Sequence, residues 1–264
     1  MVNGPLSVAI GVPAYRNQVH TGLVIQMANM SVYATVNKLH MILLFVDSSS
    51  LDWCRNRLLY DAVRSGCEWC LMVDSDTYHP RADWIYRMLD EGNRRRAAVI
   101  AAPVKMRNRP GYNVQIQTDG GPARYLDVAE IKDTLVSVTH IGTALFAIRC
   151  GWIVRHWPEG PWFQTTQIVT ARGPEKLGED FGFCRGVAKR GGTVICDGRI
   201  EAAHAHATNE TELIVRHCGG ELLEATPDLW QPDPDHDPFG DELMELWGGQ
   251  KAPPDVAHPD GATA

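Results

Sequence analysis

An apolar run of five residues, Trp69 to Val73, ends abruptly at the sequence Asp74-Ser75-Asp76. The length of the run and its β-branched end are typical of a buried strand in a parallel sheet. In an extended segment, residues i and i+2 lie on the same face, so both acids are expected to meet one ligand at the end of this strand. Ligands bind at that edge in open α/β sheets. Two carboxylates beside phosphate oxygens suit a hard divalent cation.

The chain around this run alternates between strand-like and helix-like patterns. Four segments are predicted to be strands: residues 6–12, 40–46, 69–73 and 99–104. Apolar residues at helical spacing predict the buried faces of three intervening helices: Leu23, Met27, Met30 and Ala34; Leu51, Cys54, Leu58 and Ala62; Ile85, Met88 and Leu89. Ser50 is the expected N-cap of the second helix, and Gly66 its end. The alternation predicts an α/β fold with a mostly parallel sheet and right-handed crossovers.

The second half of the chain has a different pattern. Its expected elements are a polar segment rich in glycine and proline at 105–125, a β-like segment at 135–149, a loop at 152–178, a helix at 179–190 and a short strand at 193–196. From about residue 226 the composition shifts to proline and aspartate, which is typical of a disordered tail. The expected organisation is therefore one domain at 1–225 followed by a tail at 226–264.

Composition narrows the class of protein. The net charge of −7 argues against a protein that coats DNA generally, although it allows a local basic groove. No segment has the length and apolarity of a membrane span, and the N-terminus lacks a signal-peptide pattern, so a cytoplasmic protein is expected. Seven scattered cysteines do not indicate a disulfide framework, and Cys67 and Cys70 are expected to be buried thiols.

Polar residues follow the first three predicted strands, namely Tyr15, Asp47, Asp74 and Asp76. Because parallel strands end at one edge of a sheet, this arrangement indicates a nucleotide site there. One alternative is that the two acids cap the next helix. The Asp-x-Asp pattern also resembles the phosphatases of the haloacid dehalogenase type, whose first aspartate is a nucleophile, but Tyr78 stands where that family carries Thr or Val.

Six features follow one another along the chain: the opening strand at residues 8–15, the acid-rich turn at 47–52, the Arg55-Asn56 pair, Asp74-Ser75-Asp76, Gly178-Glu179-Asp180, and His204. Together they resemble motifs of GT-A glycosyltransferases, close to family 2 and to phage and bacterial relatives. The resemblance covers roughly residues 6–207. It implies a GT-A (Rossmann-like), mostly parallel sheet flanked by helices with a smaller acceptor-side β/loop region. The nucleotide-binding half would be residues 1–104, and the acceptor half 105–225.

The resemblance also implies how a nucleotide-sugar donor would be held. The residues expected to contact the donor are Pro13, Tyr15, Asp47, Arg55, Asp74, Ser75, Asp76, Gly142 and Thr143. Pro13, Tyr15 and Asp47 would hold the base and ribose. Arg55 would pair with the diphosphate, or is otherwise a solvated helix residue. Gly142 and Thr143 would lie near the donor sugar, or otherwise form a bulge or turn.

A divalent metal is part of the same expectation. Asp76 would bind it directly, Asp74 would bind the ribose or a metal-bound water, and His204 or His206 would complete the ligand set. Imidazole beside carboxylates favours Mn²⁺ over Mg²⁺. Asp180 would be the general base in an inverting reaction, with Glu179 as the alternative base.

The acceptor is not fixed by the sequence. Trp162 and Phe163 are candidates for an acceptor-stacking platform, with a hydrophobic anchor for the loop as the alternative. A modified base in phage DNA, a glycan, a lipid and a protein are all compatible acceptors. Basic residues at 105–124 favour DNA, whereas the acidic net charge opposes it. Two other functional classes stay open: a phosphatase or nucleotidyltransferase that uses Asp74 and Asp76, and a non-catalytic nucleotide-sugar binding module.

Overall fold

The computed structural model describes residues 6–14, 18–78, 83–104, 112–117, 123–170, 173–200 and 202–204. The chain divides into two units, Met1–Glu221 and Leu222–Ala264, and every described residue belongs to the first. The predicted tail at 226–264 therefore lies outside the described residues.

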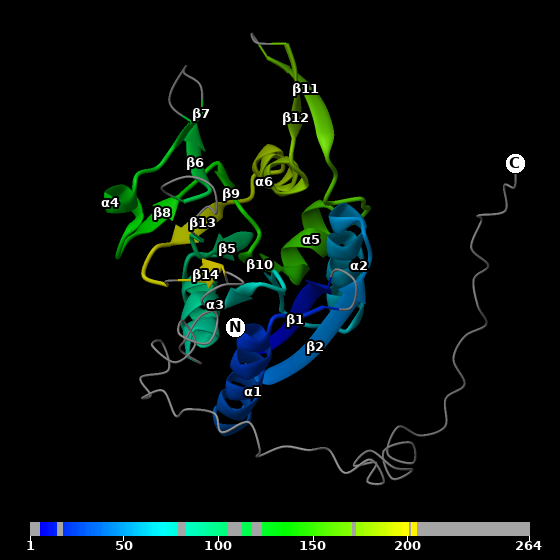
Figure 1. Ribbon diagram of the computed structural model, residues 1–264, viewed down its shortest axis with the longest axis vertical. Coiled ribbons are helices and arrows are strands. Elements are labelled where there is room, and N and C mark those ends of the chain that lie inside the picture. Colours follow the sequence, from blue (N-terminus) through cyan, green and yellow to red (C-terminus); the bar gives the residue numbers. More distant parts are fainter. Residues whose placement is uncertain are drawn as a thin grey trace, which may run out of the picture. The chain divides into compact units, whose positions relative to one another are not determined.

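Seven strands form the main sheet, in the order β2-β1-β3-β10-β5-β13-β8 (Figure 1). Their bounds are β1 Ser7–Ala14, β2 His40–Asp47, β3 Trp69–Val73, β5 Val99–Ala101, β8 Leu135–Ser137, β10 Leu145–Arg149 and β13 Val194–Asp197. β1 pairs in parallel with both β2 and β3, and β13 pairs in parallel with β5. β10 lies antiparallel between β3 and β5, and β8 is antiparallel to β13. The prediction of a mixed α/β fold with a large, mostly parallel sheet is confirmed.

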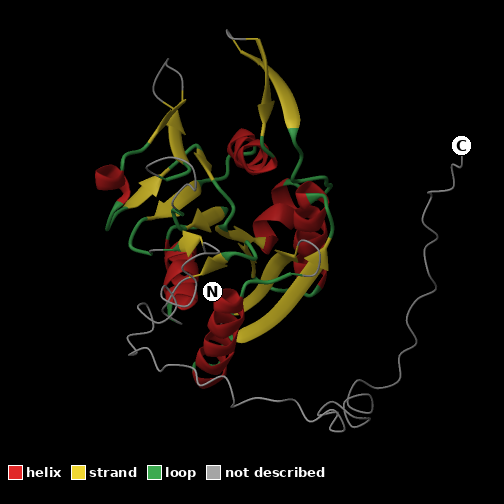
Figure 2. Cartoon of the chain, in the orientation of Figure 1, coloured by secondary structure: helices red, strands yellow, loops and turns green. Residues whose placement is uncertain are grey.

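Helices cover both faces of this sheet (Figure 2). Their bounds are α1 Thr21–Val36, α2 Leu51–Arg64, α3 Trp84–Arg94, α4 Val128–Ile131, α5 Cys150–His156 and α6 Glu179–Lys189. Buried residues of α1 and α3 pack on one face, and those of α2, α5 and α6 on the other. No helix in the described part of the chain is long and apolar enough to cross a bilayer.

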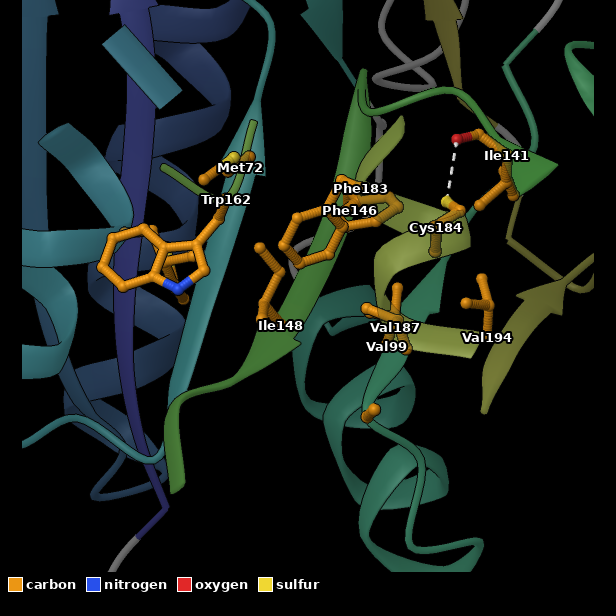
Figure 3. Packing of buried hydrophobic residues seen from close by; sticks show 14 of the residues in the cluster. Met72, Val99, Ile141, Phe146, Ile148, Trp162, Phe183, Cys184, Val187 and Val194 are labelled. Atoms are coloured by element: carbon orange, nitrogen blue, oxygen red, sulfur yellow. Dashed lines mark hydrogen bonds between the residues drawn. The ribbon is translucent and has the colours of Figure 1, made fainter. Parts of the chain in front are cut away.

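Strand β3 shows why the sheet needs two helical layers. Its five residues are all buried and alternate between the two apolar clusters. Trp69, Leu71 and Val73 pack with α1 and α3, whereas Cys70 and Met72 pack with α2, α5 and α6. Figure 3 shows the second cluster. The expectation that Cys70 is a buried thiol is confirmed, as it is for Cys67.

Helix α2 follows the sequence pattern closely. The Ser50 hydroxyl accepts a hydrogen bond from the Trp53 N–H at 3.4 Å, which confirms the predicted N-cap. Gly66 follows the helix with a φ of +71°, a backbone conformation that residues with a Cβ rarely adopt. Leu51 was predicted to be buried, but 40% of it is exposed because the first turn of the helix extends beyond the core.

The predicted loop at 152–178 was wrong. It contains most of α5 and a β-hairpin, formed by β11 Thr166–Thr170 and β12 Gly173–Leu177. Two further small sheets lie outside the main one: β6 Val114–Gln117, β7 Ala123–Tyr125 and β9 His140–Ile141 form the first, and β4 Thr77–Tyr78 with β14 Ala203–His204 forms the second. Hairpin pairing depends on contacts between two segments, and glycine and proline in this region hid the strand pattern.

Asn56 of α2 attaches the chain after α5 to the body of the protein. Its Oδ1 accepts hydrogen bonds from the backbone N–H groups of Trp162 at 2.7 Å and Phe163 at 3.0 Å. Its Nδ2 donates to the Phe163 carbonyl at 2.7 Å. One turn earlier, Asp52 accepts from the Thr165 N–H at 2.8 Å. The acid-rich turn thus supplies a structural carboxylate at its last position.

We expect Asn56→Ala to destabilise the protein by roughly 2–4 kcal/mol, because it leaves two backbone N–H groups and a carbonyl near the core without partners. Urea denaturation measures the change. Arg57→Ala, at the exposed neighbouring position, serves as the control and should change stability by less than about 0.5 kcal/mol. Equal stability of the two variants would contradict this role for Asn56.

Candidate functional site

The carboxyl ends of β1, β2 and β3 meet at one edge of the sheet. In the strand register, Ala14 lies opposite Asp47, and Pro13 is buried beside it on β1. β10 enters from the same edge, because the Asp74 N–H donates to the Ala144 carbonyl at 3.1 Å. The structure therefore brings Pro13, Asp47, Asp74 and the segment that contains Thr143 to this edge. Tyr15 lies outside the described residues.

Asp74, Ser75 and Asp76 form a turn and not an extended strand. The Thr77 N–H donates to the Asp74 carbonyl at 2.9 Å, and the His20 N–H at the start of α1 donates to the Ser75 carbonyl at 2.9 Å. The expectation that the two acids share a face by strand alternation was therefore wrong, although both lie at the predicted edge. The alternative that they cap the next helix is also wrong, because the N-cap of α3 is Asp83.

The end of the described chain returns to this turn. β14 pairs antiparallel with β4, so that the backbone of His204 lies opposite Thr77, the residue after Asp76. This pairing joins segments that are far apart in the sequence. The predicted approach of His204 to the acid turn is met at the level of the backbone, and His206 lies outside the described residues.

Arg55 occupies a buried position between two carboxylates. Its side chain is 3% exposed, its Nη2 lies 2.9 Å from Asp74 Oδ1, and its Nη1 pairs with Glu179 Oε1. Burial alone would lower the pKa of Arg55, but Asp74 and Glu179 together raise it, so the residue stays charged. The alternative of a solvated helix residue was wrong. In this structure Arg55 ties the turn after β3 to the start of α6.

Glu179 and Asp180 lie in the first turn of α6, where the helix dipole favours negative charge. Asp180 Oδ1 accepts a hydrogen bond from the Phe181 N–H at 2.7 Å. Gly178 leaves room for this carboxylate, because a Cβ at that position would lie 2.8 Å from Asp180 Oδ1. Burial, with the charge of Glu179 added, raises the pKa of Asp180 to about 6. A carboxylate with a pKa near neutrality is suited to accept a proton.

Asp180→Asn should stabilise the protein by roughly 2 kcal/mol at pH 8, because the charged aspartate is disfavoured in the folded state. The folded state binds the proton more tightly than the unfolded state, whose pKa is near 3.9. Wild type therefore recovers stability as the pH falls through 6, and the advantage of the variant should vanish below about pH 4. Denaturation of both proteins from pH 8 to pH 4 measures this, and an advantage that does not change with pH would contradict it.

Arg55→Met should destabilise the protein by roughly 3–5 kcal/mol, because Asp74 and Glu179 lose the cation that neutralises them. Arg55→Lys should recover part of this loss, since one ammonium does not reproduce two guanidinium contacts. Chemical denaturation at pH 7.5 provides the measurement. Arg57→Met removes the same charge from an exposed pair with Asp61 and should cost less than about 1 kcal/mol. If Arg55→Met lowers stability by less than about 1 kcal/mol as well, a structural role for the contacts of Arg55 with Asp74 and Glu179 is ruled out.

His140 is a buried residue near the site that the sequence pattern did not single out. Its side chain is 7% exposed, and neither ring nitrogen has a hydrogen-bond partner in the described part of the protein. Its ring stacks on Phe181 with centroids 5.0 Å apart. Burial, and next the charge of Arg185, lower the pKa of His140 to about 4, so the ring is neutral at physiological pH. An isolated histidine carries no spacing signal that would have revealed this position.

Trp162 and Phe163 do not form a stacking platform. They are 8% and 1% exposed, and both belong to the apolar cluster that includes the buried residues of α6. Figure 3 shows Trp162 within this cluster. Phe163 stacks on Phe183 with ring centroids 4.4 Å apart, and Trp162 Nε1 donates to the Trp157 carbonyl at 2.8 Å. The alternative hypothesis, a hydrophobic anchor for this segment, is what the structure shows.

Gly142 and Thr143 connect β9 to β10. The Gly142 N–H donates to the Asn113 carbonyl at 2.9 Å, and the Thr143 side chain is buried. A Cβ on Gly142 would lie 2.8 Å from the side-chain nitrogen Nδ2 of Asn113, so a larger residue here would displace that side chain. The pair adjoins the edge that carries Asp74, as the predicted donor role requires.

Comparisons with known proteins inform the fold. No protein-family profile and no curated protein sequence matches the chain. Among solved structures, it is similar to A197 from STIV, with a TM-score of 0.53 and 13% identity, over 76% of this chain and 86% of that one. It also matches 4-diphosphocytidyl-2C-methyl-D-erythritol synthase from Anaerococcus prevotii DSM 20548, with a TM-score of 0.43 and 13% identity, over 81% and 95% of the two chains. At this identity, the likeness to A197 concerns the fold alone.

Proposed function

We propose that this protein is a metal-dependent glycosyltransferase that moves a sugar from a nucleotide diphosphate to an acceptor hydroxyl. One observation carries the proposal: the acid turn after β3, the backbone of His204 and the two carboxylates of α6 converge through the β4–β14 pairing and Arg55. Each group comes from a different part of the sequence. Their meeting at the carboxyl edge of a mostly parallel sheet supports a nucleotide-derived ligand.

The turn offers two carboxylates to a divalent cation, and within the described residues no cluster of three His, Cys, Asp or Glu side chains completes such a site. Asp74 Oδ1 is held by Arg55, which suits an indirect role for Asp74 on the ribose or on a bound water. Asp76 would then bind the metal directly, with an imidazole from β14 or the residues after it. Carboxylate and imidazole ligands together favour Mn²⁺. Once bound, the metal would neutralise the charge that develops on the departing diphosphate.

The remaining residues have separable roles. The end of β1 and Asp47 would hold the nucleoside, because they lie side by side at the sheet edge. Asp180 would take the proton from the acceptor hydroxyl, and its raised pKa keeps a proton exchangeable near neutral pH. Glu179 would pair with Arg55 and hold α6 in register with the acid turn. This division favours Asp180 over Glu179 as the base.

Incubation with Mn²⁺ and a panel of nucleotide-sugars, followed by measurement of released nucleoside diphosphate, tests the proposal. Asp76→Asn should reduce turnover at least about 100-fold and raise the Mn²⁺ concentration required. Asp180→Asn should lower turnover by about 10²–10⁴-fold while donor binding is retained. Asp61→Asn, a half-buried acid of α2 paired with Arg57 and separate from the acid turn in the sequence, is the control and should leave turnover unchanged.

Other results of the same experiment would contradict the proposal. Unchanged turnover and metal dependence in Asp76→Asn would exclude the metal assignment. A fluoroberyllate adduct at Asp74, without nucleotide-sugar binding, would indicate a phosphatase. Donor binding without turnover, together with full tolerance of Asp180→Asn, would indicate a binding module.

A further inference from the structure

A basic groove runs along α6 from the first turn of the helix toward its C-terminal end. It has a volume of about 300 Å³, and its α6 wall consists of Gly182, Arg185, Gly186, Lys189 and Arg190. The first four of these residues are spaced i, i+3, i+4 and i+7, so they form one stripe of the helix. Gly182 lies in the first turn of α6, next to the turn's carboxylates, and its N–H donates to the Gly178 carbonyl at 2.9 Å. One end of the groove therefore lies at the first turn of α6, the turn that also carries Glu179 and Asp180, although neither carboxylate lines the groove.

A second hollow continues this surface along the hairpin. It has a volume of about 480 Å³ and shares Thr166 with the groove. Lys176 of β12 lines it and adds a fourth cation. None of the described residues that line the two hollows is acidic. We call the two hollows together the α6 groove.

The charges of the α6 groove are not neutralised by the described residues. Several arginines elsewhere in the described part of the chain are paired with carboxylates, as in Arg57–Asp61, Arg94–Asp90, Arg95–Glu91, Arg124–Glu130 and Arg199–Asp197, whereas Arg64, Arg87 and Arg155 are not. What distinguishes the α6 groove is that several such cations lie together. Arg185, Lys189 and Arg190 are exposed, and no carboxylate of the described residues lies within ion-pair distance of them. Concentrated positive charge on a protein with a net charge of −7 indicates an anionic partner.

The aromatic residues of the groove do not offer a free face. The Trp157 ring stacks on Phe183 with centroids 5.6 Å apart, and the Arg190 guanidinium lies over it at 4.1 Å. Gly186 permits this packing, because a Cβ there would lie 2.3 Å from the Trp157 ring. Neutral sugars and unstacked bases bind on exposed aromatic faces, so this groove is suited to bind charge and not rings.

We propose that the α6 groove binds the phosphodiester backbone of a single nucleic-acid strand. Cations that recur along one helix stripe and onto the adjacent hairpin match a polymer with one negative charge per unit. Arginine forms strong contacts with phosphate oxygens, and a groove of this volume admits one strand more readily than a duplex. That the bound strand is also the acceptor rests on the proposed function, because the groove starts at the turn that carries Asp180. Strand binding itself does not depend on sugar transfer.

Fluorescence anisotropy with a labelled single-stranded DNA 20-mer, from 50 to 200 mM salt, tests the proposal with the full chain. Three to four phosphate contacts predict a slope of log K against log salt of about −2 to −3. The double variant Arg185→Gln/Lys189→Gln should lose about 1.4 of this slope and roughly 25-fold in affinity near 0.1 M salt. Arg57→Gln/Arg95→Gln removes the same net charge from two paired arginines and should match wild type.

Three results would overturn the proposal. The first is an equal loss of DNA affinity in both double variants. The second is a failure of wild type to bind the strand at 50 mM salt. The third is tighter binding of a carboxylated polysaccharide than of DNA at the same charge density. Asp76→Asn separates this proposal from the proposed function, because it should abolish donor turnover while it binds the strand like wild type. Strand binding without turnover in wild type would leave the groove supported and the proposed function refuted.

Discussion

The site depends on the charge of Arg55. A guanidinium buried to 3% exposure is stable only with anionic partners, and Asp74 and Glu179 supply them from two distant segments. The same contact fixes the acid turn after β3 against the first turn of α6. Because desolvation makes an unpaired charge costly, burial of Arg55 constrains the spacing between Asp74 and Glu179. If one of the three charged side chains is removed, the charges that remain stay buried without full neutralisation, which costs free energy.

The two-sided sheet explains why this contact forms where it does. Residues of β3 alternate between the layer of α1 and α3 and the layer of α2, α5 and α6. Asp74 continues that alternation by one residue and reaches the side on which Arg55 and Glu179 lie. Beyond it the chain turns, and the turn is held by one backbone hydrogen bond from His20, the N-cap of α1, and by the pairing of β14 with β4. Together with Arg55 of α2, these contacts support the turn from both helical layers.

Helix α6 has a different property along each face. Phe183, Cys184 and Val187 pack into the core, Glu179 and Asp180 face the acid turn, and Arg185 and Lys189 line the α6 groove. One helix thereby connects the core, the candidate base and an electrostatic surface. The Trp157 ring contacts both Phe183 in the core and Arg190 at the α6 groove, so it links these two faces of the helix. A rearrangement of α6 would change all three at once.

Periodicity and strand-end polarity were enough to predict the strands β1, β2, β3 and β13, the buried faces of α1 and α2, and the edge that carries the acids. These features are local, because they follow from the spacing of apolar side chains and from cap residues.

The position of Arg55 was a further signal in the sequence, because this residue occupies the apolar stripe of α2 with Cys54 and Leu58. A charged residue in such a stripe requires a buried partner, and the partner's identity depends on which segments pack there. Contacts between separate segments decided the rest. They form the β11–β12 hairpin, bring the backbone of His204 to the acid turn, and attach the segment of Trp162 and Phe163 to Asn56. The free energy of such contacts comes from groups that meet only in the folded chain, so no local pattern could specify them.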